Sequence, residues 1–276
     1  MEEALAQFSR GEILQPVRSI LPVEEGRRYV GIMPAAASDY VGVKVVSAYP
    51  GNAGTSIPTH SAAILLLRAD TGEPVATVAG TTITEMRTAA VSAAVTKHLM
   101  PQRTRILALL GSGVQAHAHV EALQRIVEFE EIRVWSPNSE HAERFAREHG
   151  ATATDAESAV RDADVIVVAT HATEPVLKGA WLKTGAHVNA LGAIRPHHRE
   201  LDDDVMLATV VVDSREAARL ESGDIILSKA KITAEIGEIF AGTAAVPRAH
   251  TTVFKSLGLA VEDLAAARLV LSKTRT

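Results

Sequence analysis

The sequence predicts an α/β protein in which a doubly wound, mostly parallel sheet is joined to a β-rich α+β domain. The chain has 276 residues, enough for two modest domains with sizeable cores. Between residues 103 and 251, short apolar runs alternate with helical segments, which is the rhythm of a parallel sheet with helices on both faces. Between residues 1 and 102, Pro, Gly and Asn clusters separate β-rich runs, as in an antiparallel meander. We therefore predict one domain over 1–102 and a second over 103–251.

The first domain is expected to begin with a helix over 2–9 and to end with a helix over 82–99. Between these helices lie five β-rich runs, at 17–22, 29–33, 41–49, 61–67 and 75–79. Asp70-Thr71-Gly72-Glu73 has the composition of a hairpin turn before the last of these runs. A helical pattern returns at 252–271, and we expect the C-terminal segment 252–276 to form a helix that packs back on the first domain.

The second domain is expected to contain six strands and at least three helices. The apolar runs that we assign to strands lie at 106–110, 132–135, 151–154, 165–169, 187–191 and 210–212. The segments between the early runs have helical composition, at 114–127, 139–149 and 155–163.

The sequence that follows the run Ile106–Leu110 is typical of a dinucleotide-binding loop. It matches G-x-G-x-x-A, in which Gly111 permits a tight turn and Gly113 lets the backbone approach a ligand. Ala116 is small enough for the next helix to pack on its strand, and the positive end of that helix favours a pyrophosphate. A lone motif of this kind also occurs in ordinary strand–turn–helix connections, but here the strand and the helix stand where the motif requires them. We therefore expect a Rossmann-type nucleotide site formed by Gly111, Gly113, Val114, Gln115 and Ala116.

Cofactor preference is predicted from the segment after the second strand. NAD-specific domains usually carry an acidic residue there, which binds the ribose hydroxyls. The segment reads Trp135-Ser136-Pro137-Asn138-Ser139 and has no acid, so Ser136 and Asn138 could bind a 2′-phosphate. NADP(H) is favoured and NAD remains possible. The loops after two later strands carry Thr170, Leu191 and Gly192, which we expect to touch the cofactor, although ordinary loop structure is the alternative.

Composition and charge exclude several classes of function. The formal net charge of −5 gives no general attraction to nucleic acid or to an anionic membrane, and no apolar run approaches the roughly 20 residues of a membrane helix. The absence of cysteine excludes disulfides, thiolate catalysis and cysteine-bound zinc. The eleven histidines form no H-E-x-x-H motif, and His117 and His119 are expected to face different ways on one helix, so we predict no metal site. The acidic N-terminus differs from a basic signal peptide, and we expect a cytoplasmic protein.

Motifs distributed over nearly the whole chain carry a resemblance to a known family. They include Q-P-V-R (15–18), G-I-M-P-A (31–35), V-K-V-V (43–46), R-T-A-A-V-S-A (87–93), G-S-G-V-Q-A (111–116), A-T-E-P (172–175), R-E-L-D-D (199–203), V-D-S (212–214), E-S-G-D (221–224), T-T-V-F-K-S-L-G (251–258) and A-V-E-D (260–263). The chain resembles the ornithine cyclodeaminase/mu-crystallin family, and in particular its mu-crystallin, or ketimine reductase, branch. The resemblance implies a nucleotide domain and a β-rich domain that holds the substrate and forms a homodimer.

The resemblance also implies roles for four residues. Arg18, Lys44 and Arg87 would bind the substrate carboxylate, a task for which a planar guanidinium is well suited. From the residues alone Lys44 stands out, because it lies between two valines of an expected strand, where an unpaired buried charge is unfavourable. The alternatives are an outward-facing strand lysine at Lys44 and a solvated helix end at Arg87. Asp213 follows a strand at the ligand-binding edge of the sheet and would serve with Lys44 and Arg87 in catalysis, as a general acid/base; capping of the next helix is its alternative role.

Two departures from the family pattern bear on the activity. The chain begins about one strand and one helix later than family members, and Gly31 stands where ornithine-processing members place a glutamate. The resemblance implies an NAD(P)H-dependent reductase of cyclic ketimines or imino acids, such as piperideine- or pyrroline-2-carboxylate, that yields L-amino acids. The alternatives are an alanine-type amino-acid dehydrogenase, an ornithine cyclodeaminase and a non-catalytic small-ligand-binding protein. Gly31 argues against the cyclodeaminase, and the retained Lys44, Arg87 and Asp213 argue against a non-catalytic role.

Overall fold

A computed structural model describes residues 1–25 and 27–274, and the chain in it forms two units. Unit 1 comprises Met1–Thr88 and Gly258–Thr276, and unit 2 comprises Ala89–Leu257. The divisions therefore fall at other positions than the 102/103 and 251/252 boundaries expected from the sequence. The second half of helix α2 (Gly80–Leu99) belongs to unit 2, where the hydroxyls of Ser92 and Thr96 hydrogen-bond to the buried side chains of His119 and Asn189. Residues 26 and 275–276, which the domain prediction included, lie outside the described residues.

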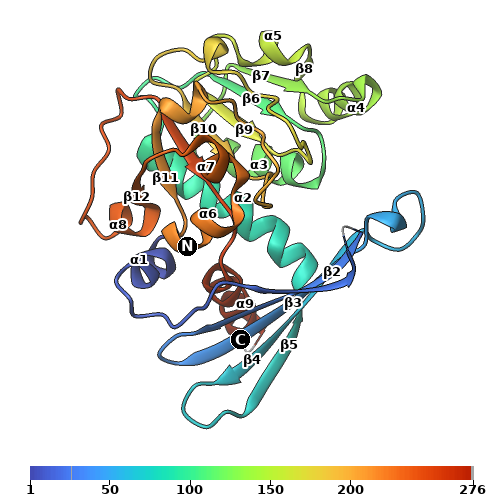
Figure 1. The fold of residues 1–276 in the computed structure, drawn as a ribbon, viewed down its shortest axis with the longest axis vertical. Coiled ribbons are helices and arrows are strands. Elements are labelled where there is room, and N and C mark those ends of the chain that lie inside the picture. Colours follow the sequence, from blue (N-terminus) through green and yellow to red (C-terminus); the bar gives the residue numbers. More distant parts are fainter. Residues whose placement is uncertain (26, 275–276) are drawn as a thin grey trace. The chain divides into compact units, whose positions relative to one another are not determined.

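Unit 1 is built on a five-stranded antiparallel sheet in the order β1-β2-β3-β4-β5, so the predicted meander is confirmed (Figure 1). Its strands are β1 (Ser19–Glu24), β2 (Arg28–Ala36), β3 (Tyr40–Ala48), β4 (His60–Arg68) and β5 (Pro74–Ala79). A short 3₁₀ turn, η1 (Pro50–Asn52), follows β3. Helix α9 (Ala260–Thr274) packs on β2, β3 and β4 and also contacts the N-terminal helix α1 (Glu2–Ser9).

The two faces of this sheet differ because successive side chains of a strand point to opposite sides. Met33, Lys44 and Ile64 are aligned across β2, β3 and β4 and are all buried. This is the face that α9 covers. A Cβ atom at Gly42 would lie 2.8 Å from the Cδ1 atom of Leu264, so the glycine permits the close approach of α9 to β3. The opposite, outer face carries exposed apolar side chains, among them Ile32, Val45 and Leu65.

Unit 2 is built on an eight-stranded parallel sheet in the order β12-β11-β13-β10-β9-β6-β7-β8 (Figure 1). Its strands are β6 (Ile106–Leu110), β7 (Glu131–Trp135), β8 (Thr152–Ala153), β9 (Val165–Val168), β10 (His187–Ala190), β11 (Thr209–Val212), β12 (Ile232–Glu235) and β13 (Thr252–Lys255). Its helices after α2 are α3 (Val114–Gln124), α4 (Ser139–His149), α5 (Ala156–Val160), α6 (Arg215–Glu221), α7 (Gly223–Ser228) and α8 (Ile236–Phe240), with 3₁₀ turns η2 (Gly179–Trp181) and η3 (Val205–Leu207). In the described part of the chain, no helix combines the length and the apolar character needed to cross a lipid bilayer.

Alternate residues of the parallel strands face two separate cores. In β6, Leu107 and Leu109 pack with α3 and α4, whereas Ala108 and Leu110 pack with α5, α6 and α7. Strand β9 divides in the same way, because Val165 and Val167 belong to the first core and Ile166 and Val168 to the second. Strands that are buried on both faces read as unbroken apolar runs in the sequence. The predicted doubly wound sheet is thereby confirmed.

The prediction of one helix over 252–276 is wrong at its beginning. Residues Thr252–Lys255 form β13, which pairs in parallel with β10 and β11 and is completely buried. Helix α9 begins only at Ala260. A four-residue strand in the middle of a sheet is too short to show a strand period, and the apolar run that follows it gives the segment a helical pattern. The β-branched and aromatic residues Thr252, Val253 and Phe254 are the local feature that favours a strand.

Candidate active site

Unit 1 contains a buried cluster of charged side chains from three elements. The Nζ atom of Lys44 on β3 lies 2.5 Å from Oδ2 of Asp263, and Nε of Arg87 on α2 donates to Oδ1 of the same aspartate at 3.0 Å. The Nη1 group of Arg87 donates to Glu262. No side chain of these four is more than 5% exposed. The alternatives of an exposed strand lysine and a solvated helix end are therefore excluded.

Local structure explains why the four groups meet. Glu262 and Asp263 stand in the first turn of α9, where the helix dipole favours acidic side chains. Arg18 joins them from the segment before β1, and its Nη2 group donates to the carbonyl of Gly258 at 2.9 Å. Gly258 has a φ of +77°, and a Cβ atom there would lie 2.6 Å from the terminal nitrogens of Arg87. Only glycine adopts this backbone conformation readily and also leaves room for the guanidinium group of Arg87.

The cluster carries an excess of one positive charge, because Arg18, Lys44 and Arg87 supply three and Glu262 and Asp263 remove two. Burial lowers the pKa of Lys44 to about 8, and the charges of Arg87 and Arg18 act in the same direction, whereas Asp263 opposes them. One further anion would balance the cluster. The roles of Glu262 and Asp263 were not predicted from the sequence, where their position at the start of a helix is the available signal.

The glycine loop of unit 2 fits a dinucleotide. Gly111 has a φ of +113°, and a Cβ atom there would lie 2.4 Å from the carbonyl oxygen of Ala169. Gly113 is the N-cap of α3 and provides no side-chain cap, and a Cβ there would meet nothing within 4 Å, so ligand atoms have room at this helix end. Val114 is exposed beside it, and Ala116 is buried in the core under α3. Gln115 bonds through its carbonyl oxygen to the ring of His119. The free N–H groups of such a helix end bind phosphate oxygens.

The residues after β7 divide into two roles. The strand ends at Trp135, and Ser136 follows directly and is half-buried. Asn138 is the N-cap of α4, and its Oδ1 atom accepts from the backbone of Glu140 at 2.9 Å and of His141 at 3.4 Å. The side-chain oxygen of Asn138 is therefore used to cap α4, a role that was not predicted from the sequence. Ser136 caps no helix and is the better candidate for a 2′-phosphate ligand.

The predicted loop residues after β9 and β10 lie next to one another. A Cβ atom at Gly192 would come within 2.3 Å of the carbonyl oxygen of Thr170, so the two loops are in direct contact. Leu191 donates its N–H to Val168 at 2.9 Å and packs against the core under α3. The backbone N–H and the hydroxyl of Thr170 both donate to Oε1 of Glu200 at 2.7 Å.

A buried ionic network that the sequence analysis missed holds these loops. Lys255, at the end of β13, donates from Nζ to the carbonyl of Gly192 at 2.5 Å and lies 3.0 Å from Oδ2 of Asp224 and 3.8 Å from Oε2 of Glu200. All three charged side chains are fully buried. Burial raises the pKa of Glu200 to about 7, against the opposing effect of Lys255. The network fixes the two loops in which Thr170 and Gly192 are expected to touch a cofactor.

Asp213 follows β11 and is completely buried. Its Oδ1 atom accepts from the N–H of Ser214 at 2.8 Å, and its Oδ2 atom accepts from the N–H of Leu257 at 2.6 Å. Helix α6 is capped by the hydroxyl of Ser214, which accepts from Ala217 at 3.3 Å. The alternative that Asp213 caps this helix is therefore wrong, and its carboxylate instead ties the end of β11 to the segment after β13.

The fold and these residues define an NAD(P)-binding protein of the Rossmann type whose other unit carries a buried cationic cluster. Residues 1–276 match the model of the ornithine cyclodeaminase/mu-crystallin family, and the chain belongs to this family. The ketimine reductase mu-crystallin of Mus musculus is 48% identical over 279 residues, which cover 98% of the chain and 89% of the mouse protein.

Two solved structures share the fold and have nicotinamide cofactors bound. One is Thermococcus litoralis Δ1-pyrroline-2-carboxylate reductase in complex with NADH and L-proline, with a TM-score of 0.91 and 36% identity over 99% of this chain and 90% of that one. The other is an archaeal alanine dehydrogenase dimer with bound NAD, with a TM-score of 0.91 and 32% identity over the same shares of the two chains.

Proposed function

We propose that this protein is an NAD(P)H-dependent reductase of cyclic imino acids of the pyrroline- or piperideine-2-carboxylate type, which it converts to L-amino acids. The observation that carries the proposal is the buried cluster of unit 1 with its single excess positive charge, which one substrate carboxylate would balance. The relatives add support, because one is a ketimine reductase and another holds NADH together with L-proline, a cyclic amino acid. Unit 1 would bind the substrate and unit 2 the cofactor.

The cluster retains hydrogen-bonding capacity for a carboxylate. A lysine ammonium has three N–H donors and an arginine guanidinium has five. Lys44 pairs with Asp263, and Arg87 uses Nε and Nη1 for the two acids of α9. The remaining N–H groups would bind the substrate carboxylate, with Arg18 as the third cation. In this scheme Glu262 and Asp263 hold the two cations in position.

The nitrogen of the substrate needs a proton donor or acceptor. When bound, the nicotinamide cofactor supplies a hydride to the carbon of the C=N bond. Asp213 lies directly after β11 at the ligand-binding edge of the parallel sheet, and we assign it the proton at the substrate nitrogen. The glycine loop and the free end of α3 would hold the pyrophosphate, and the loops of Thr170, Leu191 and Gly192 would hold the nicotinamide half.

The preferred cofactor is proposed to be NADP(H), because no acid follows β7 to repel a 2′-phosphate. Ser136→Asp should then shift the preference toward NADH by roughly tenfold, equivalent to about 1.4 kcal/mol of new repulsion. The ratio of kcat/KM for NADPH and NADH, measured on wild type and variant, tests this expectation. Ser139→Asp, one position past the helix cap, is the control and should leave the ratio nearly unchanged. A wild type that already prefers NADH would contradict the assignment.

A homodimer is proposed to form through the outer face of the unit 1 sheet. We define this face by Leu21, Ile32, Val45 and Leu65, which are 58%, 40%, 44% and 38% exposed. The strand register places them on the side opposite Lys44. An uncovered apolar sheet face of this kind is typical of an interface, and the archaeal alanine dehydrogenase is a dimer.

Val45→Glu should therefore convert the dimer into a monomer, because it would bury an unpaired carboxylate of each subunit in an apolar interface. Sedimentation at micromolar concentration measures the change. Leu207→Glu is the matched control, since Leu207 is 83% exposed in unit 2 and lies outside the proposed interface. A monomeric wild type, or dissociation by Leu207→Glu alone, would rule out this interface.

A substrate panel separates the proposed reaction from the alternatives. Gly31 lies on the same sheet face as Lys44, and a Cβ atom there would already be 3.0 Å from Cγ1 of Val46, so this position offers no carboxylate for a second substrate amine. We expect cyclic imino acids to oxidise NADPH, and ornithine to release no ammonia. A preference for pyruvate with ammonia would indicate an alanine-type dehydrogenase, and tight ligand binding without turnover would indicate a non-catalytic protein.

A further inference from the structure

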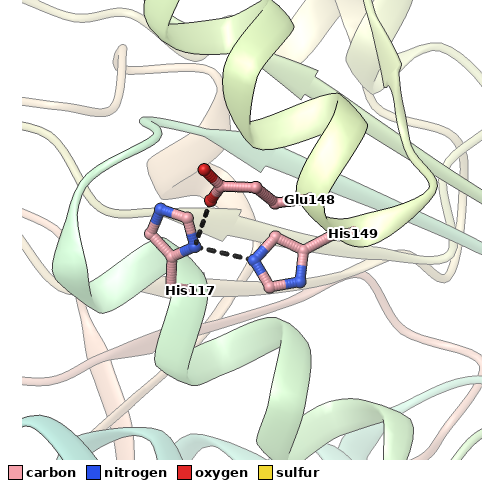
Figure 2. Close-up of side chains that lie close together, drawn as sticks. All are labelled: His117, Glu148 and His149. Atoms are coloured by element: carbon pink, nitrogen blue, oxygen red, sulfur yellow. Dashed lines mark hydrogen bonds and ion pairs between the residues drawn. The ribbon is translucent and has the colours of Figure 1, made fainter.

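A second polar cluster in unit 2 uses none of the residues assigned above to substrate or cofactor. His117 on α3 and Glu148 and His149 at the end of α4 direct their side chains toward one another (Figure 2). Nδ1 of His117 lies 2.7 Å from Nε2 of His149 and 3.8 Å from Oε2 of Glu148. One ligand atom from each residue falls within 4.8 Å of the other two.

The rings are held in place by a buried neighbour. The ring centroid of Phe145, which is 1% exposed, lies 4.6 Å from that of His117 and 4.5 Å from that of His149. Both imidazoles therefore rest on the same aromatic side chain with their nitrogens turned toward each other. Such pre-orientation reduces the rotamer freedom that a bound ion would have to remove.

Glu148 occupies a position that local helix energetics disfavour. It stands in the last turn of α4, which ends at Gly150 with a φ of +63°. The negative end of a helix dipole repels a carboxylate, and the residues of basic type in this turn are Arg147 and His149. A cation bound between Glu148 and the two imidazoles would reverse this unfavourable interaction.

The donor set selects a particular class of metal. Two imidazole nitrogens and one carboxylate oxygen suit Zn²⁺ and the neighbouring transition metals, whereas Mg²⁺ and Ca²⁺ prefer oxygen ligands alone. Zn–N bonds of about 2.05 Å in tetrahedral geometry separate two nitrogens by about 3.3 Å. The present separation of 2.7 Å would therefore widen by about 0.6 Å, a change that small side-chain rotations provide. The proton now between the two nitrogens would move to the outer nitrogen of one ring, so that both facing nitrogens can bind the ion.

We infer that His117, Glu148 and His149 form a site for a divalent transition metal of the Zn²⁺ class, which clips α3 to α4. Three protein ligands leave a fourth position for water, and Glu148 is the exposed member of the set. This site was not predicted from the sequence, because spacing along one helix does not reveal ligands that the fold joins from 32 positions apart.

The test uses the full chain without an affinity tag, freed of metal by chelator and dialysis. Zn²⁺ is titrated in competition with a chromophoric chelator, and Co²⁺ binding is followed by its visible absorption. We expect one ion per chain, a higher melting temperature with Zn²⁺, and no competition from Mg²⁺ or Ca²⁺. His117→Gln, His149→Gln and Glu148→Gln should each weaken Zn²⁺ binding about tenfold or more and abolish the thermal effect.

Two variants, His141→Gln and Glu148→Gln, distinguish a specific metal site from general binding of Zn²⁺ by surface histidines. His141→Gln removes an exposed histidine of α4 that lies outside the cluster, and it should bind Zn²⁺ like wild type. Glu148 is 50% exposed, so its replacement tests the site without disturbing the aromatic contacts of Phe145. Unchanged affinity in His117→Gln and His149→Gln, or an equal loss in His141→Gln, would show surface histidine binding only and overturn the site. Neither outcome depends on the proposed reductase activity.

Discussion

Replacing Lys44 with Met is expected to lower kcat/KM for a cyclic imino acid by 10- to 150-fold while the affinity for NADPH stays nearly unchanged. A charge-assisted hydrogen bond to a desolvated carboxylate contributes about 1.5–3 kcal/mol, which corresponds to this range. Methionine keeps the length and the apolar stem of the side chain but removes its charge. Steady-state kinetics with a carboxylated imine, together with NADPH titration, measure both quantities.

The charge balance of the cluster provides a sharper test than the single variant. Lys44→Met reduces the excess charge from +1 to zero, and Asp263→Asn added to it restores +1, since the lysine and one acid are then both absent. If net charge attracts the substrate carboxylate, the double variant should bind it better than Lys44→Met does. The double variant should also regain part of the stability lost when the buried ion pair is broken.

Two further measurements separate carboxylate binding from other roles of Lys44. An imine without a carboxylate should be a poor substrate for wild type and hardly poorer for Lys44→Met. The pKa of Lys44 is about 8, so its ammonium is lost as pH rises through this value. Wild-type kcat/KM for carboxylated substrates should fall above about pH 8, and this limb should disappear in Lys44→Met. Equal losses with both kinds of imine would point to proton transfer by Lys44 instead.

Much of the fold was predictable because its strands are buried on both faces or alternate cleanly. The predicted strand at Ile106–Leu110 and the predicted helix at Ser139–His149 coincide with β6 and α4. Strand β6 is followed by a glycine loop, and helix α4 begins after the cap Asn138 and ends at Gly150. These glycine and asparagine positions are strong local signals for the ends of elements. Strand β13 was missed because its four residues carry no period of their own.

The candidate site was predictable only for residues with a local anomaly. Lys44, between two valines, signalled a buried cation, whereas its partner Asp263 lies more than 200 positions away. Lys255 carries the same anomaly, a lysine at the end of Thr-Val-Phe, but the helical interpretation of this segment concealed it. Pairings over such distances depend on the packing of the whole chain, and no spacing rule in a single sequence reports them.

The second large effect is expected at Asp213, where Asn should lower kcat by a factor of about 10² to 10⁴ if the carboxylate exchanges a proton with the substrate nitrogen. An amide group cannot perform this exchange. KM for the imino acid and the affinity for NADPH should change far less than kcat, because neither the carboxylate-binding cluster nor the glycine loop is altered.

The hydrogen bonds of Asp213 require a control for structural damage. Its two oxygens accept from Ser214 and Leu257, and the amide nitrogen of an asparagine could not replace one of them, so a stability loss of about 1–3 kcal/mol is also expected. Ser214→Ala removes the neighbouring helix cap and should lower stability by about 1 kcal/mol without touching the carboxylate. If Ser214→Ala lowered kcat as far as Asp213→Asn does, catalysis would depend only on the rigidity of the segment around 213–214. Asp213 would then be a positioning residue. Retained kcat in Ser214→Ala, beside the large loss of kcat in Asp213→Asn, assigns the proton to the carboxylate itself.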